Sequence, residues 1–366
     1  MQPNPVPLGA RTMAKVVGGF ASSHSPLMSL TGELWEMHAK NDLRNRELVK
    51  MPEGKRVTYD ELLAGADPKI AKMINREVFD GRVDHIQKGL DELDTRFGQT
   101  DIDVMIMFGD DQSEFFFEDN MPSINLYWGD TIKMLPRPIT DKMTEAQKVS
   151  SRAYGTVEKD WPVDSALGLH VLESLMEDDF DIAQSRYLRP EFGGKIGPAT
   201  WYLDMERSTE PRPFGIQHAF GFGMARWFHG KTVPVIPITI NTCYPPNWIS
   251  PRRAYNLGRA VRKAVDAWKD EGVRVAFGCT GGLSHFVVDE ELDRQTLKGL
   301  ETANGEILTS LPRHRLQSAT TEILNWVAVQ GAMGDTKMET ITYEAGYRTP
   351  AGTGCGCAVG HWSNGH

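Results

Sequence analysis

The chain has 366 residues and a formal net charge of −9, and hydrophobic and charged residues make up 40% and 24% of the sequence. Such values are typical of a globular protein that buries a substantial core. The net acidity, which no basic stripe interrupts, argues against a nucleic-acid partner, and no apolar run approaches the ~20 residues that a membrane helix needs.

Residues 1–14 are polar at their start and contain several prolines, so we interpret them as an N-terminal arm rather than a signal peptide or an anchor. Beyond this arm, four apolar runs have the length and the β-branched content of buried strands. They are Lys15–Phe20, Ile102–Phe108, Thr232–Ile240 and Val273–Cys279.

Helical periods separate these runs. In Arg253–Trp268, the apolar residues Leu257, Val261 and Val265 recur at a spacing of four, which is typical of one face of a helix. Three further segments show the same kind of periodicity, namely residues 83–97, 164–176 and 320–328.

Strands that alternate with helices of this length predict an α/β fold. We expect a single large domain over residues 15–357, with a mostly buried central sheet flanked by helices. Helical or loop insertions are expected near residues 34–98 and 186–215, where the sequence is more polar, and residues 358–366 are expected to form a tail.

The four cysteines indicate a reduced protein. Cys279 lies in an apolar run and is expected to be a buried thiol, and Cys243 stands alone. Cys355 and Cys357 are too close in sequence for an ordinary disulfide loop, and no second cysteine pair completes a zinc site. A cytoplasmic location follows as the expectation.

The common catalytic motifs are missing from the sequence. No glycine-rich phosphate-binding loop follows the early strands, and the Gly281-Gly282 pair alone is a weak signal. A GxSxG nucleophile elbow is also absent, which removes the commonest serine hydrolase interpretation.

Polar residues instead follow the ends of the predicted strands. Since the carboxyl ends of parallel strands form the crevice where ligands bind, these residues are candidates for one metal or acid–base site. They are His24 after the first run, Asp110, Asp111 and Gln112 after the second, His218 before the third, and His285 after the fourth. Taken singly, each histidine has a structural alternative as a hydrogen-bonded core residue, and the two aspartates could cap a turn.

Several segments, taken in order along the chain, carry a resemblance to one family. They are Ser23-His-Ser-Pro26, Gly109-Asp-Asp111, residues 174–181, Asn241-Thr-Cys-Tyr-Pro-Pro246, Thr280-Gly-Gly-Leu-Ser-His285, and Glu322-Ile-Leu-Asn-Trp326 followed by Gly331-Ala332. Together they resemble the type III extradiol ring-cleavage dioxygenases, the family of the protocatechuate 4,5-dioxygenase β (catalytic) subunit. The most specific segments are the Thr-Gly-Gly-x-Ser-His motif and the Glu-x-x-x-Trp helix.

The resemblance implies a non-haem Fe(II) site made of two histidines and one glutamate, with open positions for a catechol and dioxygen. It assigns His24 and Glu322 as metal ligands. It also assigns His285 as the acid–base histidine that takes a catechol proton, and His218 as a contact to the hydroxyl region of the substrate.

Gln112 departs from the family pattern, which has the second histidine ligand at this position. An amide oxygen is a neutral and weak donor, whereas imidazole binds divalent iron well, so the substitution should weaken iron binding. The sequence leaves two states open. Either Gln112 or a water completes an iron site, or the protein has lost iron and keeps its acid–base histidines.

The sequence is therefore compatible with three functions. The first is an extradiol dioxygenase that acts with Fe(II) and dioxygen on a small catechol- or gallate-type phenol. The second is a divergent enzyme that performs non-oxidative acid–base chemistry on a phenol, as a carbon–carbon lyase, hydrolase or decarboxylase. The third is a non-catalytic subunit on the same fold. A homo-oligomer is also expected, with residues 34–98 as a candidate contact.

Overall fold

The computed structural model describes residues 13–117, 120–155, 157–188, 215–269 and 272–363. Within these ranges, four parallel strands form the centre of a nine-stranded sheet, in the order β1, β10, β4 and β9. Their bounds are β1 Lys15–Ser22, β10 Arg274–Thr280, β4 Val104–Asp110 and β9 Val235–Ile240. They are almost wholly buried, as their continuous apolar sequences predict for strands covered on both faces.

Antiparallel strands extend the sheet on both sides. On one side, β13 (Thr353–Ser363) pairs with β1, and it also pairs with β11 (His285–Val287) and β12 (Met338–Tyr347). On the other side, β5 (Ile124–Tyr127) pairs antiparallel with β9 and parallel with β8 (Ala183–Ser185). Two small hairpins lie outside the sheet, β2–β3 (Val49–Lys50, Lys55–Arg56) and β6–β7 (Thr131–Met134, Lys159–Pro162).

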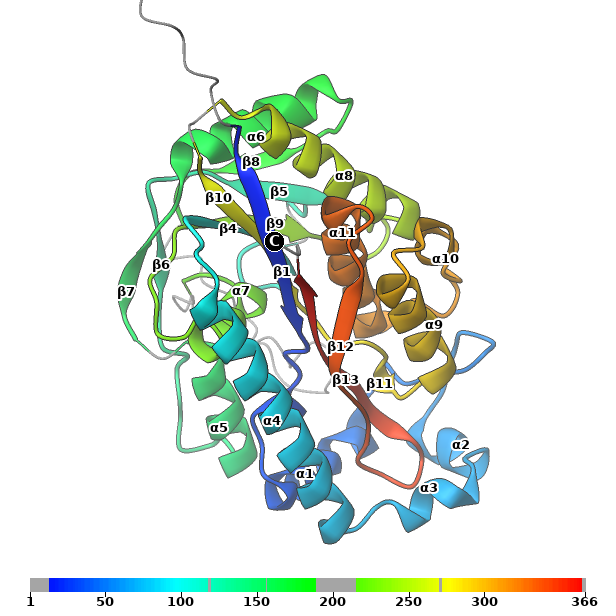
Figure 1. Ribbon diagram of the computed structural model, residues 1–366. Coiled ribbons are helices and arrows are strands. Elements are labelled where there is room, and N and C mark those ends of the chain that lie inside the picture. Colours follow the sequence, from blue (N-terminus) through cyan, green and yellow to red (C-terminus); the bar gives the residue numbers. More distant parts are fainter. Residues whose placement is uncertain (1–12, 118–119, 156, 189–214, 270–271, 364–366) are drawn as a thin grey trace, which may run out of the picture.

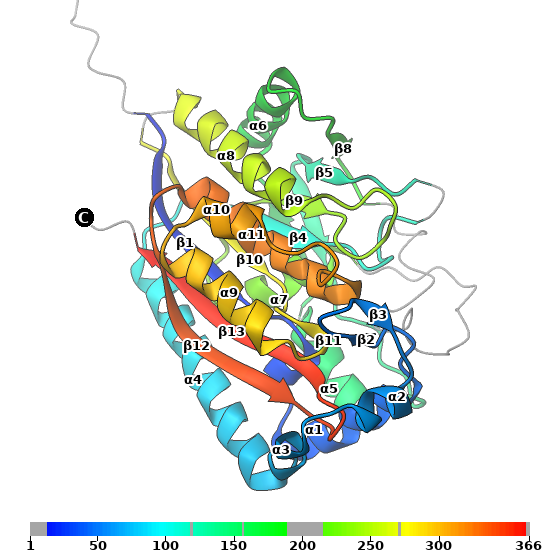
Figure 2. The ribbon, with the colours of Figure 1, turned by 90° about the vertical axis from the view of Figure 1, so that its right-hand side faces the viewer.

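Helices cover both faces of the sheet (Figure 1, Figure 2). One apolar core includes residues of α6 (Ser165–Glu177), α8 (Pro251–Ala267), α9 (Glu290–Glu301), α10 (Gly305–Thr309) and α11 (Ile323–Met333). The core on the opposite face includes residues of α1 (Gly32–Ala39), α4 (Arg76–Gln99), α5 (Glu145–Ala153) and α7 (His218–Arg226). The short helices α2 (Tyr59–Ala64) and α3 (Pro68–Lys72) connect α1 to α4.

Helix α11 is unusual because every one of its residues is buried. Its sequence is mostly apolar, and a helix without a polar outer face has to lie inside the protein rather than on its surface. It packs against α8, where Gly258 allows close approach because a Cβ there would meet the backbone of Ala328. The helix therefore starts at a fixed position beside the sheet, with Glu322 immediately before its first residue.

The predicted fold class is confirmed, and the four predicted central strands differ from β1, β4, β9 and β10 by only a few residues at their ends. The predicted helices correspond to α4, α6, α8 and α11. Among the described residues, none of the helices combines the length and the apolar character needed to cross a membrane.

The expected tail at residues 358–366 needs correction. Strand β13 continues to Ser363, and residues 359–363 pair with β1, so this part of the chain lies within the central sheet. The segment 34–98 also differs from a simple insertion, because its helix α4 packs on β1, β12 and β13 and forms one of the covering layers. Most of the second expected insertion, residues 189–214, lies outside the described residues.

Trp362 tests the place of β13 in the core. Its side chain is 0% exposed and its indole nitrogen donates to Gln330, so Trp362→Ala should lower the free energy of unfolding by about 3–5 kcal/mol. Urea unfolding followed by circular dichroism measures this loss. The control Met176→Ala removes a side chain that is 51% exposed and should change stability by less than about 0.5 kcal/mol. Equal effects of the two substitutions would contradict a buried β13.

Candidate active site

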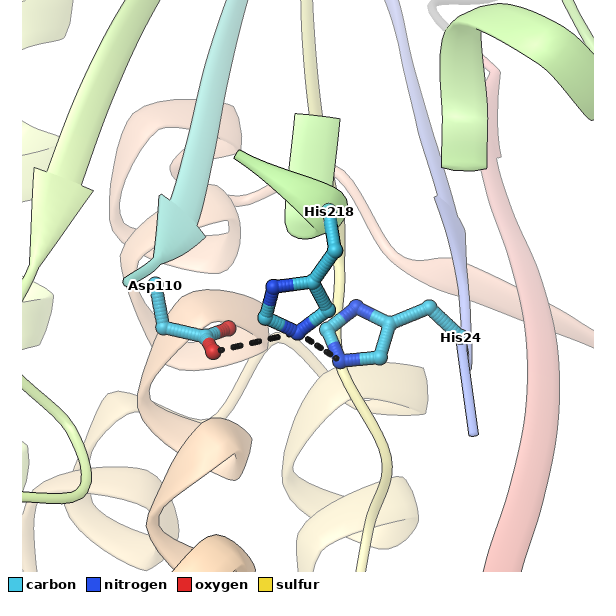
Figure 3. A group of neighbouring side chains, drawn as sticks. All are labelled: His24, Asp110 and His218. Carbon is cyan, nitrogen blue, oxygen red and sulfur yellow. Dashed lines mark hydrogen bonds and ion pairs between the residues drawn. The ribbon is translucent and has the colours of Figure 1, made fainter. Parts of the chain in front are cut away.

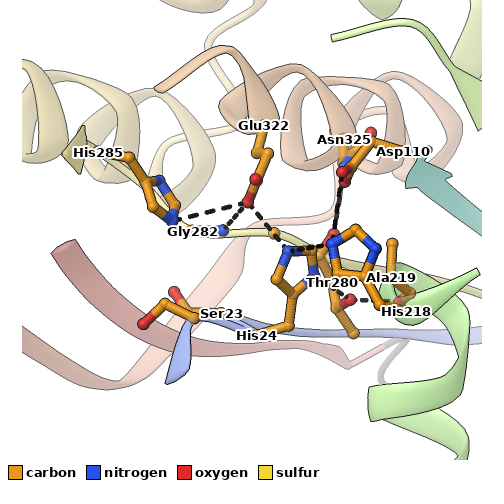
Figure 4. A network of polar contacts seen from close by, with 12 residues as sticks. Ser23, His24, Asp110, His218, Ala219, Thr280, Gly282, His285, Glu322 and Asn325 are labelled. Carbon is orange, nitrogen blue, oxygen red and sulfur yellow. Dashed lines mark hydrogen bonds and ion pairs between the residues drawn. The ribbon is translucent and has the colours of Figure 1, made fainter. Parts of the chain in front are cut away.

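The carboxyl ends of the parallel strands bring the candidate residues together (Figure 4). His24 follows β1, Gln112 follows β4, and His285 follows the turn after β10. Glu322 arrives from the start of α11 and His218 from the start of α7. All five side chains are buried. Residues nearly 300 positions apart in the sequence (24 and 322) therefore share one polar cluster.

The carboxylate of Glu322 is the centre of this cluster. Its Oε2 accepts from the backbone N–H of Gly282 at 2.7 Å and lies 3.2 Å from Nε2 of His24 and 3.8 Å from Nε2 of His285. Its Oε1 accepts from Nε2 of Gln112 at 2.9 Å. Burial alone would raise the pKa of Glu322, but the neighbouring imidazoles outweigh it and lower the pKa to about 2. Glu322 is therefore an ionised carboxylate.

The glycine pair after β10 makes this arrangement possible. A Cβ on Gly281 would lie 3.2 Å from Glu322, and a Cβ on Gly282 would overlap the ring of His285. At position 282, the missing side chain allows the turn to donate its N–H to Glu322 while the imidazole of His285 packs over it. The Gly281-Gly282 pair, a weak signal in the sequence, thus has a structural reason.

His24 is held in one tautomer. Its Nδ1 lies 2.8 Å from the hydroxyl oxygen of Thr280, and that hydroxyl donates its only proton to the carbonyl of Ala219. Nδ1 of His24 must therefore be the donor, which leaves a lone pair on Nε2. Burial lowers the pKa of His24 more than Glu322 raises it, so the ring is neutral. Its lone pair faces the carboxylate of Glu322.

His285 has the same tautomer as His24, with the proton on Nδ1. Its Nδ1 donates to the carbonyl of Leu283 at 3.0 Å, so its Nε2 is an acceptor, 3.3 Å from the thiol sulfur of Cys355. Burial, opposed in part by Glu322, lowers the pKa of His285. A neutral imidazole with a free Nε2 inside a polar cluster has the properties of a general base.

His218 differs from the other two histidines in its partners. Its Nδ1 lies 2.5 Å from a carboxylate oxygen of Glu114, which also pairs with Arg137. Its Nε2 lies 3.2 Å from Nε2 of His24 and 3.7 Å from Oδ2 of Asp110. Burial would lower the pKa of His218, but the carboxylates around it, with Glu114 the strongest, raise the pKa to about 9.

The two adjacent aspartates have separate roles. Asp111 accepts hydrogen bonds from the backbone N–H groups of Glu114, Phe115 and Phe116, so it caps the loop after β4. Asp110 enters the site: its Oδ1 accepts from Asn325 at 3.0 Å, while its Oδ2 is buried and makes no hydrogen bond among the described residues. Burial and the like charge of Glu322 raise the pKa of Asp110 to about 8.

The donor set fits a divalent metal ion. Nδ1 of His24 is committed to Thr280, so its Nε2 is the atom that could bind a cation, and it lies 3.2 Å from Oε2 of Glu322. An ion between these two atoms would be coordinated by both, and mixed imidazole and carboxylate donors suit iron and related metals. Two groups of side chains could hold an ion: His24, Asp110 and His218 (Figure 3), and Asp110, Cys243 and Glu322.

Some residues of the cluster could not be selected from the sequence. Glu114 stands two positions after Gln112 in an acidic loop and carries no motif. Cys355 reaches His285 only because β13 pairs with β11, and neither strand has a clear signal in the sequence. Thr280 and Asn325 are within the quoted motifs, so the resemblance could have suggested them.

Comparisons with known proteins agree with this site in part. Residues 224–358 match the family described as the catalytic LigB subunit of aromatic ring-opening dioxygenase. A gallate dioxygenase from Pseudomonas putida is 29% identical over 126 residues, which are 34% of this chain and 30% of the relative. The matched stretch thus spans less than a third of that relative's length.

A solved structure of an uncharacterized protein from Escherichia coli covers 75% of this chain and 92% of its own, with 10% identity and a TM-score of 0.39. The family match confirms the resemblance to the type III extradiol dioxygenases. Its range includes His285 and Glu322, whereas His24, Gln112 and His218 lie before it.

The electrostatics of His218 can be tested by titration. In metal-free protein, the imidazolium of His218 should persist at neutral pH and lose its proton near pH 9. Removal of its carboxylate partner by Glu114→Gln should move this pKa downward, because the charge that stabilises the protonated form is gone. Nuclear magnetic resonance of ¹⁵N-labelled histidine measures both values, with His218→Gln identifying the signal.

The matched control for this titration is Asp94→Asn, which changes the partner of the exposed His229 and should leave the signal of His218 unmoved. Titration of His218 below pH 7 in the unsubstituted protein would contradict the proposed pairing with Glu114.

Proposed function

We propose that this protein is a ring-cleaving dioxygenase of the extradiol type, with Fe(II) as its cofactor and a small catechol- or gallate-type phenol as its substrate. The observation that supports this most strongly is that the Nε2 atoms of His24 and His285 both lie close to one carboxylate oxygen, Oε2 of Glu322. The family resemblance assigns two of these residues as metal ligands and the third as the base. The match of residues 224–358 to ring-opening dioxygenases supports the same reaction class.

His24 and Glu322 would hold the metal. His24 presents the lone pair of Nε2, because Thr280 fixes its Nδ1 as a donor. Glu322 is oriented by the N–H of Gly282 and by the amide of Gln112. The chemistry that Fe(II) supplies in such a site is the binding of a diol and of dioxygen at open coordination positions.

Gln112 would act as a positioning residue. A carboxylate oxygen can only accept a hydrogen bond, so the amide group that faces Glu322 at 2.9 Å has to be the NH₂. Gln112 therefore restrains the carboxylate instead of offering its oxygen in that direction. The family's histidine at this position is thus replaced by a residue that supports a neighbouring ligand.

His285 would take the proton of the substrate hydroxyl. Its Nδ1–H is committed to the carbonyl of Leu283, so Nε2 is the acceptor that faces the cluster. Proton transfer to Nε2 needs no change of tautomer, and the carboxylate of Glu322, 3.8 Å away, would stabilise the imidazolium that forms. The thiol of Cys355 lies 3.3 Å from the same nitrogen.

A second candidate function is non-oxidative acid–base chemistry on a phenol, as a carbon–carbon lyase, hydrolase or decarboxylase. Gln112 favours it, because the family's second histidine ligand is absent while His285 is present with a free Nε2. A purely non-catalytic subunit is less favoured. Burial of the ionised carboxylate of Glu322 costs free energy, and a subunit with no catalytic role would gain nothing from it.

Oxygen consumption tests the first function. Protein reconstituted anaerobically with Fe(II) should consume dioxygen when a catechol or gallate and air are added, and the product should absorb as an opened ring. His285→Gln should lower kcat by about 10²–10⁴-fold with the iron content unchanged, since it removes the base and leaves the ligands. The control His229→Gln alters an exposed histidine and should leave kcat unchanged.

The second function makes the opposite prediction. Turnover of a phenolic substrate in anaerobic buffer that contains a chelator would support it and would rule out the dioxygenase. If product forms only in the presence of dioxygen, the non-oxidative alternative is eliminated. If the wild-type protein, like His285→Gln, turns over no phenol under either condition, both enzymatic functions are ruled out.

A further inference from the structure

We propose that His218 and Asp110 bind the metal together with His24 and Glu322, so that the second histidine ligand of this protein comes from α7 and not from position 112. The inference deepens the proposed function and rests on it only in requiring that an ion is bound. It concerns the identity of the ligands, which metal binding can test without any catalysis.

The spacing of the two imidazoles fits one shared ion. Metal–nitrogen bonds of about 2.0–2.1 Å place two ligand nitrogens about 3.0 Å apart at a right angle and about 3.4 Å apart at a tetrahedral angle. Nε2 of His24 and Nε2 of His218 lie 3.2 Å apart, and both rings present these atoms to each other (Figure 3). Oδ2 of Asp110 lies 3.7 Å from the same Nε2 of His218, across from His24 (Figure 3).

Both rings also carry the outer contacts that metal-binding histidines use. Such a histidine donates its other ring N–H to an oxygen, which fixes the tautomer and aims the lone pair at the metal. Nδ1 of His24 donates to Thr280, and Nδ1 of His218 faces Glu114 at 2.5 Å. Arg137 pairs with Glu114, so this outer carboxylate is already neutralised and does not compete for the ion.

A hydrogen bond between the rings of His24 and His218 explains fewer of these observations than a shared metal ion does. A proton between His24 and His218 would account for their 3.2 Å separation, but it leaves Oδ2 of Asp110 buried without a hydrogen bond. It also leaves Asp110 and Glu322 with no lysine or arginine against either carboxylate in the described part of the chain. One divalent cation in place of the His218 proton would coordinate the free oxygen of Asp110 and the Nε2 atoms of both rings.

The backbone supports the approach of α7 to the sheet. Gly109 precedes Asp110 on β4, and a Cβ at this position would lie 2.9 Å from Phe220 and 3.0 Å from Ala219. The missing side chain lets the first turn of α7 pack directly on the strand end. His218 therefore reaches the centre of the site, while Gln112 is turned toward Glu322.

Metal titration distinguishes the two candidate ligands. Co(II) added to metal-free protein should bind at one equivalent per chain, measured by calorimetry and by the visible absorption of the bound ion. His218→Ala should weaken binding by more than about 100-fold, beyond the 10–100-fold loss typical of outer-shell partners, and Asp110→Asn should also weaken it. Gln112→Ala, a matched change at a buried polar residue that only orients the ligand Glu322, should weaken binding by no more than about 10–100-fold.

The number of imidazole nitrogens bound to the metal can be measured by spectroscopy. Electron paramagnetic resonance of the Cu(II)-loaded protein should show hyperfine coupling to two imidazole nitrogens, and to one in His218→Ala. If the alanine variant does not fold, His218→Gln keeps a hydrogen-bonding side chain beside Glu114 and should give the same loss of one nitrogen.

The outcomes separate this inference from the proposed function. Loss of metal in Gln112→Ala with retention in His218→Ala would overturn the ligand assignment and leave the dioxygenase proposal intact. Metal binding through His218 in a protein that consumes no dioxygen would support the ligand set while the proposed function fails. A wild-type protein that binds neither Co(II) nor Fe(II) would overturn the ligand set outright.

Discussion

An ionised carboxylate buried away from water has to be solvated by the protein itself, and Glu322 imposes this requirement on the whole molecule. Its hydrogen-bond donors come from the turn after β10 and the loop after β4, and the neighbouring imidazoles come from the ends of β1 and β10. The carboxylate can be placed this deeply only because α11 is buried on all sides and starts at the edge of the sheet. The architecture and the polar cluster are therefore two aspects of one constraint.

Much of the fold could be predicted because its central elements have strong local signals. The runs that became β1, β4, β9 and β10 are continuous and apolar, as strands covered on both faces require. Strand β13 has no such signal. Its sequence contains three glycines and two cysteines and shows no alternation, because close neighbours and not side-chain periodicity determine its place in the sheet.

The site could be predicted as a set of residues but not as a geometry. The strand-end rule and the family resemblance both select His24 and His285, the resemblance alone selects Glu322, and the structure brings these three together. Neither could tell that His218 meets His24, since this contact depends on how closely α7 packs on β4. The adjacent aspartates were equally ambiguous, because neighbouring residues at a strand end point in opposite directions and only Asp110 faces the cluster.

The position of β13 has a consequence for how the chain acquires its structure. Strand β1 begins at Lys15, yet one of its two neighbours is the segment that ends at Ser363, so this pairing closes a loop of more than 300 residues. During synthesis the ribosome must release this whole loop before this edge of β1 is covered. Until then the nascent protein carries an open strand edge beside apolar residues, a state in which chaperone binding would compete with aggregation.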